Sequence, residues 1–318
     1  MDEFDLIKSY FAPLATSAGA DALRDDVAEI APGLIATKDA IVEGIHFLPG
    51  DPIGTVAQKL VRVNVSDIVA KGGRPDAALL ALVWPKGRDK AEIAEFARVL
   101  GNDLAKWGAH LVGGDTTSTD GPLTLTLTLM GRVGERGPVR RSGAQVGDDV
   151  WVTGTIGDGL LGLMAAQGRF GKLSAEASNL LVSRYRVPEP PKLAFADLVA
   201  KVATGSVDVS DGLVADAGHV AEASGVRIVI RACNVPLSAV AESYVTNGRV
   251  TLGALLTGGD DYQTLFTAPP SARVEIAARA SRIGVVEAGS GVSVVDAAGV
   301  EMAFESAGWT HFSGASEA

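Results

Sequence analysis

Six short acidic patches carry the residues of this sequence best suited to chemistry. They are Arg24-Asp25-Asp26, Thr37-Lys38-Asp39, Ser66-Asp67, Gly113-Gly114-Asp115, Asp208-Val209-Ser210-Asp211 and Gly258-Gly259-Asp260-Asp261. Nearly all lie where an apolar, strand-like run ends or a helix-like run begins. Hard divalent cations such as Mg²⁺ take oxygen ligands and usually bridge one or two carboxylates to substrate phosphates. If these patches converge on one cleft, they would suit a nucleotide and its metal ions. The pattern therefore points toward phosphoryl transfer.

The composition favours a folded protein with two domains and argues against some partners. With 318 residues, 47% of them hydrophobic, the chain can bury sizeable cores. Its net charge of -10 and pI near 4.9 argue against broad binding to nucleic acid or to an anionic membrane. We therefore expect neither as a partner, and an anionic substrate would be bound by metal ions, a few arginines and backbone amides.

Several features predict a soluble cytoplasmic protein. The single cysteine, Cys233, excludes an intramolecular disulfide and is too little for a thiolate zinc site, which fits a reducing compartment. The first five residues are acidic and lack the basic and long apolar regions of a signal peptide. No stretch approaches 18 uninterrupted apolar residues.

Alternating strand and helix patterns in the first half predict an α/β domain. The expected elements are a strand at 33–37, a helix at 55–71, a strand at 77–83, a helix at 89–107 and a strand at 110–112 that runs into Gly113. Between 123 and 129 leucine and threonine alternate, so this segment should bury a leucine face. The threonine face would meet solvent or a subunit contact.

A polar turn at 143–149 predicts a boundary between two domains, 1–148 and 149–318. The second domain should also be α/β, so the fold class is mixed α/β (α+β). Its expected strands are at 150–153, before 208, at 226–230 and at 262–267, and its expected helices are at 159–167, 174–185, 191–202 and 211–223. A further helix through Arg282 and a closing hairpin near 284–296 would complete it.

No standard nucleotide-binding loop is present. The pattern G-x-x-x-x-G-K-[ST] does not occur, so a P-loop kinase is not expected. Gly157 to Gly162 fits G-x-G-x-x-G, but the acidic residue expected after a second strand is missing, which favours a tight strand-to-helix turn. Gly113 to Thr117 is a better phosphate candidate, because glycines let backbone amides approach an anion and Asp115 could hold its metal ion.

Other candidate residues have ordinary structural explanations as well. Ser210 or Asp211 could cap a helix, although capping does not account for Asp208 at a strand end. Paired acids at 260–261 are often simply solvated. A lone histidine such as His46 more often makes a structural hydrogen bond than binds a ligand. Arg140 and Arg141 suit phosphate recognition, although adjacent surface arginines are usually solvated.

Taken in order, these residues resemble the thiamine-monophosphate kinase family, a branch of the aminoimidazole-ribonucleotide-synthetase-like superfamily. The resemblance covers nearly the whole chain, from Phe4-Asp5-Leu6-Ile7 to Trp309-Thr310-His311-Phe312. The distinguishing pieces are Glu43-Gly44-Ile45-His46-Phe47, Asn64-Val65-Ser66-Asp67, Gly113-Gly114-Asp115-Thr116-Thr117, Arg141-Ser142-Gly143-Ala144, Val152-Thr153-Gly154-Thr155, Ser210-Asp211-Gly212-Leu213 and Gly259-Asp260-Asp261-Tyr262.

The resemblance implies transfer of the γ-phosphoryl group of ATP to thiamine monophosphate, with several Mg²⁺ ions. It also implies a homodimer whose N-terminal domains form a shared β-barrel, with the nucleotide near that interface. The metal-site residues that it implies are Asp26, Thr37, Asp39, Asp67, Asp115, Asp208 and Asp211. The implied ATP contacts are Gly114, Asp115, Arg141 and Ser210, and the implied acceptor contacts are His46, Asp260 and Trp309. No general base is implied, because the acceptor is a phosphate oxygen that is already largely ionised.

The sequence departs from the family pattern at three places. Leu23 and Arg24 precede the first acidic pair, where the family usually has Gly-x-Gly. Lys38 precedes Asp39 in place of a small residue, and Asp260 stands where the family usually has glutamate.

Two other functions stay open at this stage. One is another ATP-using synthetase of the superfamily, similar to aminoimidazole ribonucleotide synthetase. The members that handle selenide or carbamoyl groups generally carry glycine-rich or cysteine-containing N-terminal segments, and this chain has neither before Asp26. The other is a Ca²⁺-binding scaffold, although no D-x-[DN]-x-[DN]-G loop is present.

Overall fold

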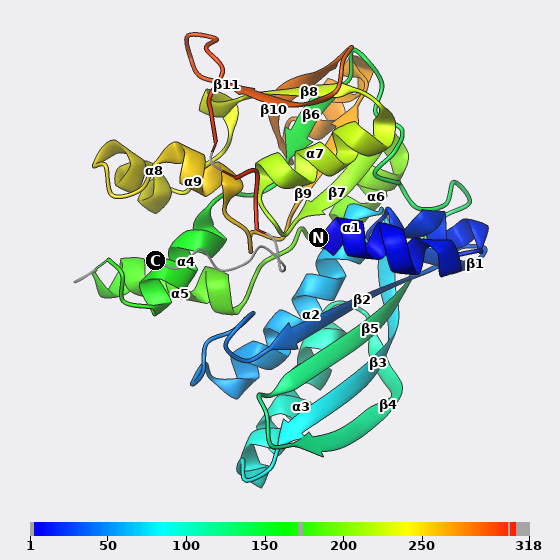
Figure 1. Cartoon of the computed structure of the whole chain (residues 1–318), viewed down its shortest axis with the longest axis vertical. Coiled ribbons are helices and arrows are strands. Elements are labelled where there is room, and N and C mark those ends of the chain that lie inside the picture. Colours follow the sequence, from blue (N-terminus) through cyan, green and yellow to red (C-terminus); the bar gives the residue numbers. More distant parts are fainter. Residues whose placement is uncertain (1–2, 171–173, 305, 310–318) are drawn as a thin grey trace.

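The fold is built on two β-sheets, one from each half of the chain (Figure 1). The structure is a computed structural model, and it describes residues 3–170, 174–304 and 306–309. In Figure 1 the sheet of the second half lies above that of the first half. This arrangement confirms the expected mixed α/β fold.

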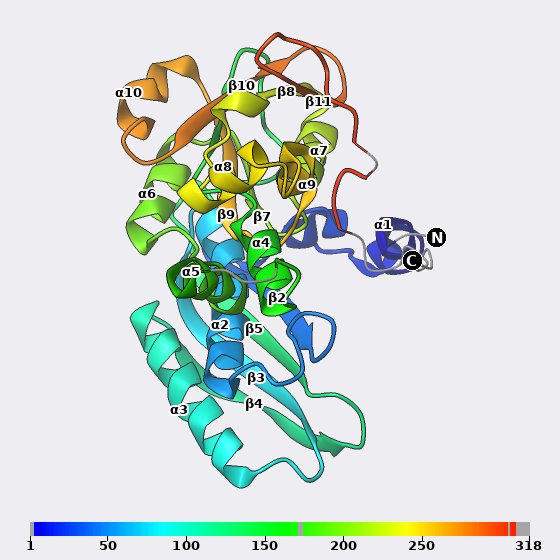
Figure 2. The same ribbon diagram turned by 90° about the vertical axis from the view of Figure 1, so that its left-hand side faces the viewer.

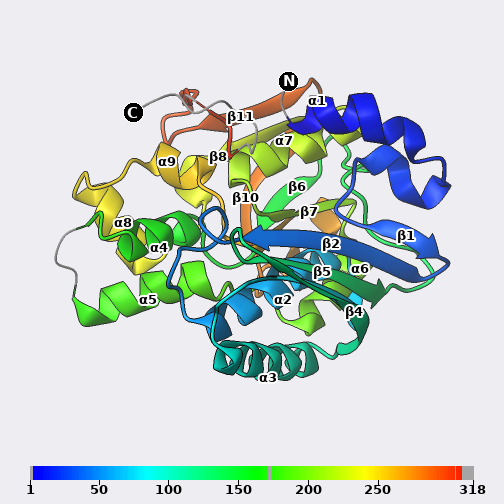
Figure 3. The ribbon, with the colours of Figure 1, turned by 60° about the horizontal axis from the view of Figure 1, so that its bottom comes forward.

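The first sheet has five strands in the order β1-β2-β5-β3-β4. The elements of this half are α1 (Glu3–Leu6), β1 (Ala28–Ala31), β2 (Leu34–Val42), α2 (Ile53–Ala70), β3 (Arg74–Pro85), α3 (Lys90–Lys106), β4 (His110–Thr119) and β5 (Thr124–Arg132). Helices α2 and α3 lie on the same side of this sheet (Figures 2 and 3). The sheet is antiparallel except for the β3–β4 pair, which is parallel because α3 connects these two strands.

The leucine face predicted at 123–129 is confirmed. Leu123, Leu125, Leu127 and Leu129 are fully buried and belong to one core with residues of α2. The intervening threonines are half-buried. The period-two alternation of β5 therefore places the leucines against the helices and the threonines on the opposite face of the sheet.

The second sheet has six strands in the order β11-β8-β10-β6-β9-β7. The elements of this half are β6 (Asp149–Val152), α4 (Asp158–Ala166), α5 (Ala175–Arg186), α6 (Leu193–Val202), β7 (Gly205–Val209), α7 (Leu213–Ser224), β8 (Arg227–Arg231), α8 (Ala239–Thr246), α9 (Leu252–Thr257), β9 (Gln263–Ala268), α10 (Arg273–Ile276), β10 (Ser281–Glu287) and β11 (Gly291–Val295). Helix α7 packs on this sheet, where it contacts β7, β8, β9 and β11.

Helix α2 links the two halves. It packs on β2 and β5 of the first sheet and also contacts β7, β9 and α6 of the second half. Fifteen of its 18 residues are buried, which explains why its sequence is apolar nearly all round. Burying a polar residue on such a helix costs free energy unless that residue is paired, so the buried polar residues of α2 require partners elsewhere in the fold.

Four predictions from the sequence are wrong in detail. Thr37, Lys38 and Asp39 do not follow a strand, because β2 continues to Val42 and pairs with β5 over its whole length. The Gly113-Gly114-Asp115 segment is not a turn, because β4 continues through it to Thr119 and pairs with β3. In both places hydrogen bonding to a neighbouring strand outweighs the local signal of glycine or charge.

The end of the chain also differs from the prediction. The helix expected through Arg282 ends at Ile276, and Arg282 lies in β10. The segments β10 and β11 do not form a hairpin with each other, because β8 lies between them, antiparallel to β10 and parallel to β11. Within the described residues, no helix is both long and apolar enough to cross a membrane.

Candidate active site

A cavity of about 730 Å³ lies where α2, β2 and the loops after β7 and α9 meet. Its lining combines carboxylates with apolar side chains from both halves of the chain. The residues with carboxylate or hydroxyl groups in the lining are Asp39, Asp67, Asp208, Ser210, Asp211, Thr257, Asp260 and Tyr262. His46 and Trp309 also line it. Residues from four of the six acidic patches therefore converge on one cavity.

Three carboxylates form the densest part of this site. One ligand oxygen from each of Asp26, Asp67 and Asp208 lies within 4.8 Å of the others. Thr37 supports this group, because its hydroxyl donates to Asp67 at 2.6 Å. Asp67 comes from the last turn of α2, Asp208 from the end of β7, and Asp26 from the segment before β1, so only the tertiary fold brings them together.

For Asp67, Asp208 and the neighbouring Asp39, burial and the charges of other carboxylates outweigh the effect of any nearby cation and raise each pKa. Burial, followed by the charges of Asp208, Asp39 and Asp26, raises the pKa of Asp67 well above its ordinary value. Burial and the charge of Asp26 raise the pKa of Asp208 to about 7. Burial, Asp26 and Asp211 raise the pKa of Asp39 to about 6. Carboxylates that repel one another in a buried site are the donor set that a hard divalent cation binds.

A second group of charges, next to the first, is compensated. Lys71 lies 2.7 Å from Asp25 and 2.6 Å from Asp26, and all three side chains are buried. Arg141 donates its Nε to Asp26 at 2.8 Å. Burial alone would raise the pKa of Asp26, but the charges of Arg141 and Lys71 outweigh burial and hold the pKa below its ordinary value. Asp26 thus belongs both to the three-carboxylate group and to a network of cations.

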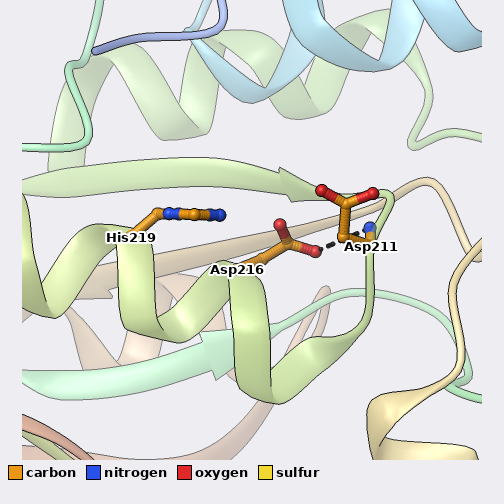
Figure 4. Close-up of side chains that lie close together, drawn as sticks. All are labelled: Asp211, Asp216 and His219. Atoms are coloured by element: carbon orange, nitrogen blue, oxygen red, sulfur yellow. Dashed lines mark hydrogen bonds between the residues drawn. The ribbon is translucent and has the colours of Figure 1, made fainter. Parts of the chain in front are cut away.

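The loop between β7 and α7 is held by Asp216. Its carboxylate accepts hydrogen bonds from the backbone N–H groups of Ser210, Asp211 and Gly212, at 3.1, 3.1 and 3.2 Å. Figure 4 shows Asp216 and His219, one turn further along α7, directed toward Asp211. Since Gly212 has a φ of 127°, a side chain there would be strained and would also meet the backbone of Thr257. Ser210 and Asp211 are therefore presented to the cavity by a rigid turn.

Asp211, Asp216 and His219 also form a compact group, with ligand atoms within 4.8 Å of one another. Burial, followed by the charge of Asp211, raises the pKa of Asp216 well above its ordinary value. Burial and the charge of Arg141 lower the pKa of His219 to about 4, so its imidazole is neutral near pH 7. With three backbone hydrogen bonds on one oxygen, Asp216 has a clear structural role in the turn.

The expected acceptor residues lie at the other end of the cavity. Lys59, which is buried, donates to Asp260 at 2.8 Å and to the carbonyl oxygen of His46 at 2.9 Å. The hydroxyl of Tyr262 donates to the second oxygen of Asp260 at 3.0 Å. The Nδ1 atom of His46 accepts the backbone N–H of Val42 at 3.0 Å, so this nitrogen shapes the loop while the ring lines the cavity.

Trp309 is 59% exposed and lines both the main cavity and a neighbouring one of about 600 Å³. Its backbone N–H donates to the carbonyl oxygen of Asp211 at 2.9 Å, which fixes this end of the chain near the cavity. The residues of the resemblance that follow it, 310–312, lie outside the described residues.

Gly114 and Asp115 are not brought to the cavity by this chain. Both lie on β4, which forms an edge of the first sheet and whose residues up to Ser118 are exposed. Gly114 has a φ of 157°, and a Cβ there would lie 1.9 Å from the carbonyl oxygen of Leu80. Glycine is therefore required for strand pairing here.

The segment from Gly157 to Gly162 is the strand-to-helix connection that the sequence favours, since Gly157 directly precedes α4 and the residues after it form the start of that helix. Two of its backbone N–H groups are already used, because Asp261 accepts those of Gly157 and Gly159 at 2.7 and 3.0 Å. Burial raises the pKa of Asp261 to about 8. An internal carboxylate therefore fills the place that a phosphate takes in a dinucleotide-binding turn.

Sequence reasoning missed three residues that organise the site, Lys59, Lys71 and Asp216. A signal was present for the two lysines, because Lys59 lies among the apolar residues of the predicted helix and Lys71 directly follows the apolar run at 68–70. A charged residue on the buried face of a helix implies a buried partner. Asp216 gave no such signal, since an acid near the start of a helix is ordinary.

Comparisons with known proteins identify the family of the chain. Residues 24–133 match the family model described as AIR synthase related protein, N-terminal domain, and residues 145–297 match its C-terminal domain. The chain is 38% identical to the thiamine-monophosphate kinase of Caulobacter vibrioides, over 97% of this chain and 90% of that protein. It is 35% identical to that of Aquifex aeolicus, over 88% of both chains.

The fold also matches a solved structure described as AaThiL complexed with AMPPCP and TMP. The TM-score is 0.86 at 33% identity, and the match covers 98% of this chain and 97% of the other. A hydrogenase maturation protein, HypE, in complex with ATP matches with a TM-score of 0.66 at 18% identity, which shows a shared fold alone. By its sequence, its two domains and its fold, the chain belongs to the thiamine-monophosphate kinase family of AIR synthase related proteins.

Proposed function

We propose that this protein transfers the γ-phosphoryl group of ATP to thiamine monophosphate, giving thiamine diphosphate and ADP. The observation that carries the proposal is the cavity in which buried, mutually repelling carboxylates face an apolar wall and an exposed tryptophan. Such a cavity can hold a polyphosphate through cations at one end and a heteroaromatic ring at the other. The family to which the chain belongs and the ligands named for the AaThiL structure support the same reaction.

The residues present fit divalent cations. Asp26, Asp67 and Asp208 would hold one such ion, since their oxygens lie within 4.8 Å of one another. Asp39 interacts electrostatically with Asp26 and Asp211, so we propose that Asp39 and Asp211 bind further ions in the same cavity. Thr37 contacts this group through Asp67 and completes the set on the side of β2. When bound, Mg²⁺ would neutralise the phosphate oxygens and polarise the γ-phosphorus.

The residues of this chain would bind and orient the two substrates. Ser210 presents its hydroxyl from the rigid turn that Asp216 fixes, and Arg141 would contact the nucleotide phosphates from its place beside Asp26. Asp260, held by Lys59 and Tyr262, would face the acceptor together with His46, and Trp309 would stack on its ring. No side chain need remove a proton from the acceptor, because a phosphate monoester is already largely ionised near pH 7.

A homodimer is part of the proposal. Strand β4 is an exposed edge, and Leu79, Leu111 and Val112 on β3 and β4 are 41, 49 and 53% exposed. A second copy that pairs along this face would cover these side chains and close the two sheets into a barrel. It would also bring Gly114 and Asp115 of one subunit toward a nucleotide near the interface, a role these residues cannot fill within one chain.

The remaining expectations belong to the same proposal. Division of the chain into 1–148 and 149–318 is supported by the two sheets, which fall on opposite sides of that boundary. A cytoplasmic site of action fits a pathway enzyme that uses ATP, and the net charge of -10 argues against nucleic acid or an anionic membrane as partner.

The test is ADP release from Mg-ATP by the purified protein, with the organic product identified by mass. Thiamine monophosphate, free thiamine, an aminoimidazole-pathway substrate and no acceptor are compared. Thiamine diphosphate formed from the monophosphate alone supports the kinase. Turnover with the aminoimidazole-pathway substrate would move the protein to the synthetase alternative, and cation binding without any turnover would favour the scaffold alternative.

A further inference from the structure

Lys71 occupies an unusual place at the end of α2. It follows the last helical residue, and its side chain is completely buried. Its ammonium group contacts Asp25 at 2.7 Å, Asp26 at 2.6 Å and the carbonyl oxygen of Ser206. An ammonium group has three N–H donors, and these three oxygens can accept all of them.

The three oxygens come from segments that are far apart in the sequence. Asp25 and Asp26 lie before β1, Ser206 lies on β7 of the second half, and Lys71 itself ends α2. A buried charge is tolerated only when it is paired and hydrogen-bonded, and this one is held by oxygens in the way that a small metal cation would be. The oxygens of Asp25, Asp26 and Ser206 therefore form a binding place for a positive charge.

Lys71 also lies directly beside the proposed metal ligands. Asp67 lies in the last turn of α2 and Lys71 stands four residues later, directly after the helix ends, which is the spacing of neighbouring side chains along a helix. Asp26 contacts Lys71 and is also one of the three carboxylates whose oxygens lie within 4.8 Å. One oxygen of Asp26 contacts the ammonium of Lys71 and the other accepts from the guanidinium of Arg141, so two cations of the protein hold this carboxylate beside Asp67 and Asp208.

We propose that the Lys71 ammonium is a permanent cation of the active site, which takes the place between Asp25, Asp26 and Ser206 that a divalent ion would otherwise fill. Lys71 is thus a positioning residue that fixes Asp26 as a metal ligand and confines divalent ions to the side of Asp67 and Asp208. The inference rests on the proposed function, since it concerns the same metal site.

The test measures cation binding by the protein without substrates. The substitution Lys71→Met removes the charge and keeps an unbranched apolar chain of similar length. We expect K71M to unfold at a lower temperature than the wild type when no divalent cation is present. Saturating MgCl₂ should then raise its Tm by about twice the rise seen in the wild type, because the vacated place binds an additional ion.

The matched control is Arg62→Met. Arg62 lies on the same helix and forms a buried ion pair with Asp103, at 3.0 Å, away from the cavity lining. R62M should lose stability as well, but its Tm rise with MgCl₂ should equal that of the wild type. An equal Mg²⁺ response in K71M, R62M and the wild type would overturn the inference, because the role of Lys71 would then be structural alone.

A second measurement covers the case in which K71M does not fold. The double variant Asp25→Asn/Lys71→Met removes one carboxylate together with the ammonium group. Bound Mn²⁺ is counted by electron paramagnetic resonance in the double variant and in the wild type. One additional Mn²⁺ per chain in the variant supports the inference, and an equal count contradicts it. Absence of any Mg²⁺ or Mn²⁺ binding by the wild type would instead contradict the proposed metal site itself.

Discussion

The two charged regions of the active site solve the problem of buried charge in opposite ways. Around Asp25 and Asp26, cations of the protein compensate the carboxylates, and the pKa of Asp26 is held low. Around Asp67 and Asp208, carboxylates face other carboxylates, and both pKa values are raised. The first region is compensated by cations of the protein itself, whereas the second is the region where we propose that divalent cations bind. Under the proposed function, the difference separates residues that stabilise the fold from residues that would bind the metal ions of the reaction.

The largest expected effect is on turnover, in the uncompensated region. The substitution Asp67→Asn removes a charge from the three-carboxylate group but keeps an oxygen that can accept the hydroxyl of Thr37. We expect kcat to fall by about 10³-fold or more, because electrostatic stabilisation of the transferring phosphoryl group is lost. Thermal unfolding of the same variant should show an intact fold. Normal ADP release by D67N would contradict the assignment of this group as the metal site.

The second effect is on stability, in the compensated region. The substitution Asp26→Asn leaves the ammonium of Lys71 and the guanidinium of Arg141 without one of their partners. We expect the free energy of unfolding to fall by about 3 kcal/mol, since breaking a buried pair leaves an uncompensated charge. Urea unfolding of D26N and D67N without metal measures the contrast directly. Equal losses in the two variants would remove the distinction between the two regions.

The third prediction concerns pH in the absence of divalent cations. The pKa of Asp39 is raised from 3.8 to about 6 and that of Asp208 from 3.8 to about 7. Between the ordinary pKa of 3.8 and these raised values, the folded state binds more protons than the unfolded state. The contribution of these two groups to the free energy of unfolding is therefore greatest below about pH 4 and is lost as the pH rises toward 7. Urea unfolding from pH 5 to 8 should show this slope.

Addition of MgCl₂ should flatten the same slope, because bound cations favour the ionised carboxylates. The variant Asp208→Asn is the control, since it lacks one of the two titrating groups and should show a smaller slope without metal. A slope of the opposite sign in the metal-free wild type would mean that the carboxylates are already compensated within the chain.

The smallest expected effect is in the loop that carries Asp25 and Asp26. Asp21, Ala22 and Leu23 have φ values of 45°, 52° and 58°, in the left-handed region that favours glycine. Leu23 is 44% exposed, so Leu23→Gly loses little packing. We expect the variant to be more stable by up to about 1 kcal/mol, because the strain is relieved. The free energy of unfolding in urea is compared with that of Leu23→Ala, which has a Cβ and therefore keeps the strain. Equal stability of the two variants would argue against strain at this position.

The periodic elements of this fold could be predicted because their signals are local. The buried leucine face of β5 and the apolar helix α2 follow from the spacing of side chains. The strands β2 and β4 were predicted too short, since glycine and charged residues suggest a turn when the pairing partners are unknown. The closing hairpin was wrong because β8, distant in the sequence, inserts between β10 and β11.

The residues suited to the chemistry can be recognised from the sequence, because the residue types in the acidic patches suit metal ions and phosphate whatever the fold. Which of them lie close together depends on the folding of distant segments. The tertiary structure brings Asp67, Asp208 and Asp26 within reach of one another, leaves Asp115 on an exposed strand, and places the cation of Lys71 beside Asp26. The physical reason is that charge compensation depends on distances of a few ångströms between distant segments, which no local pattern encodes.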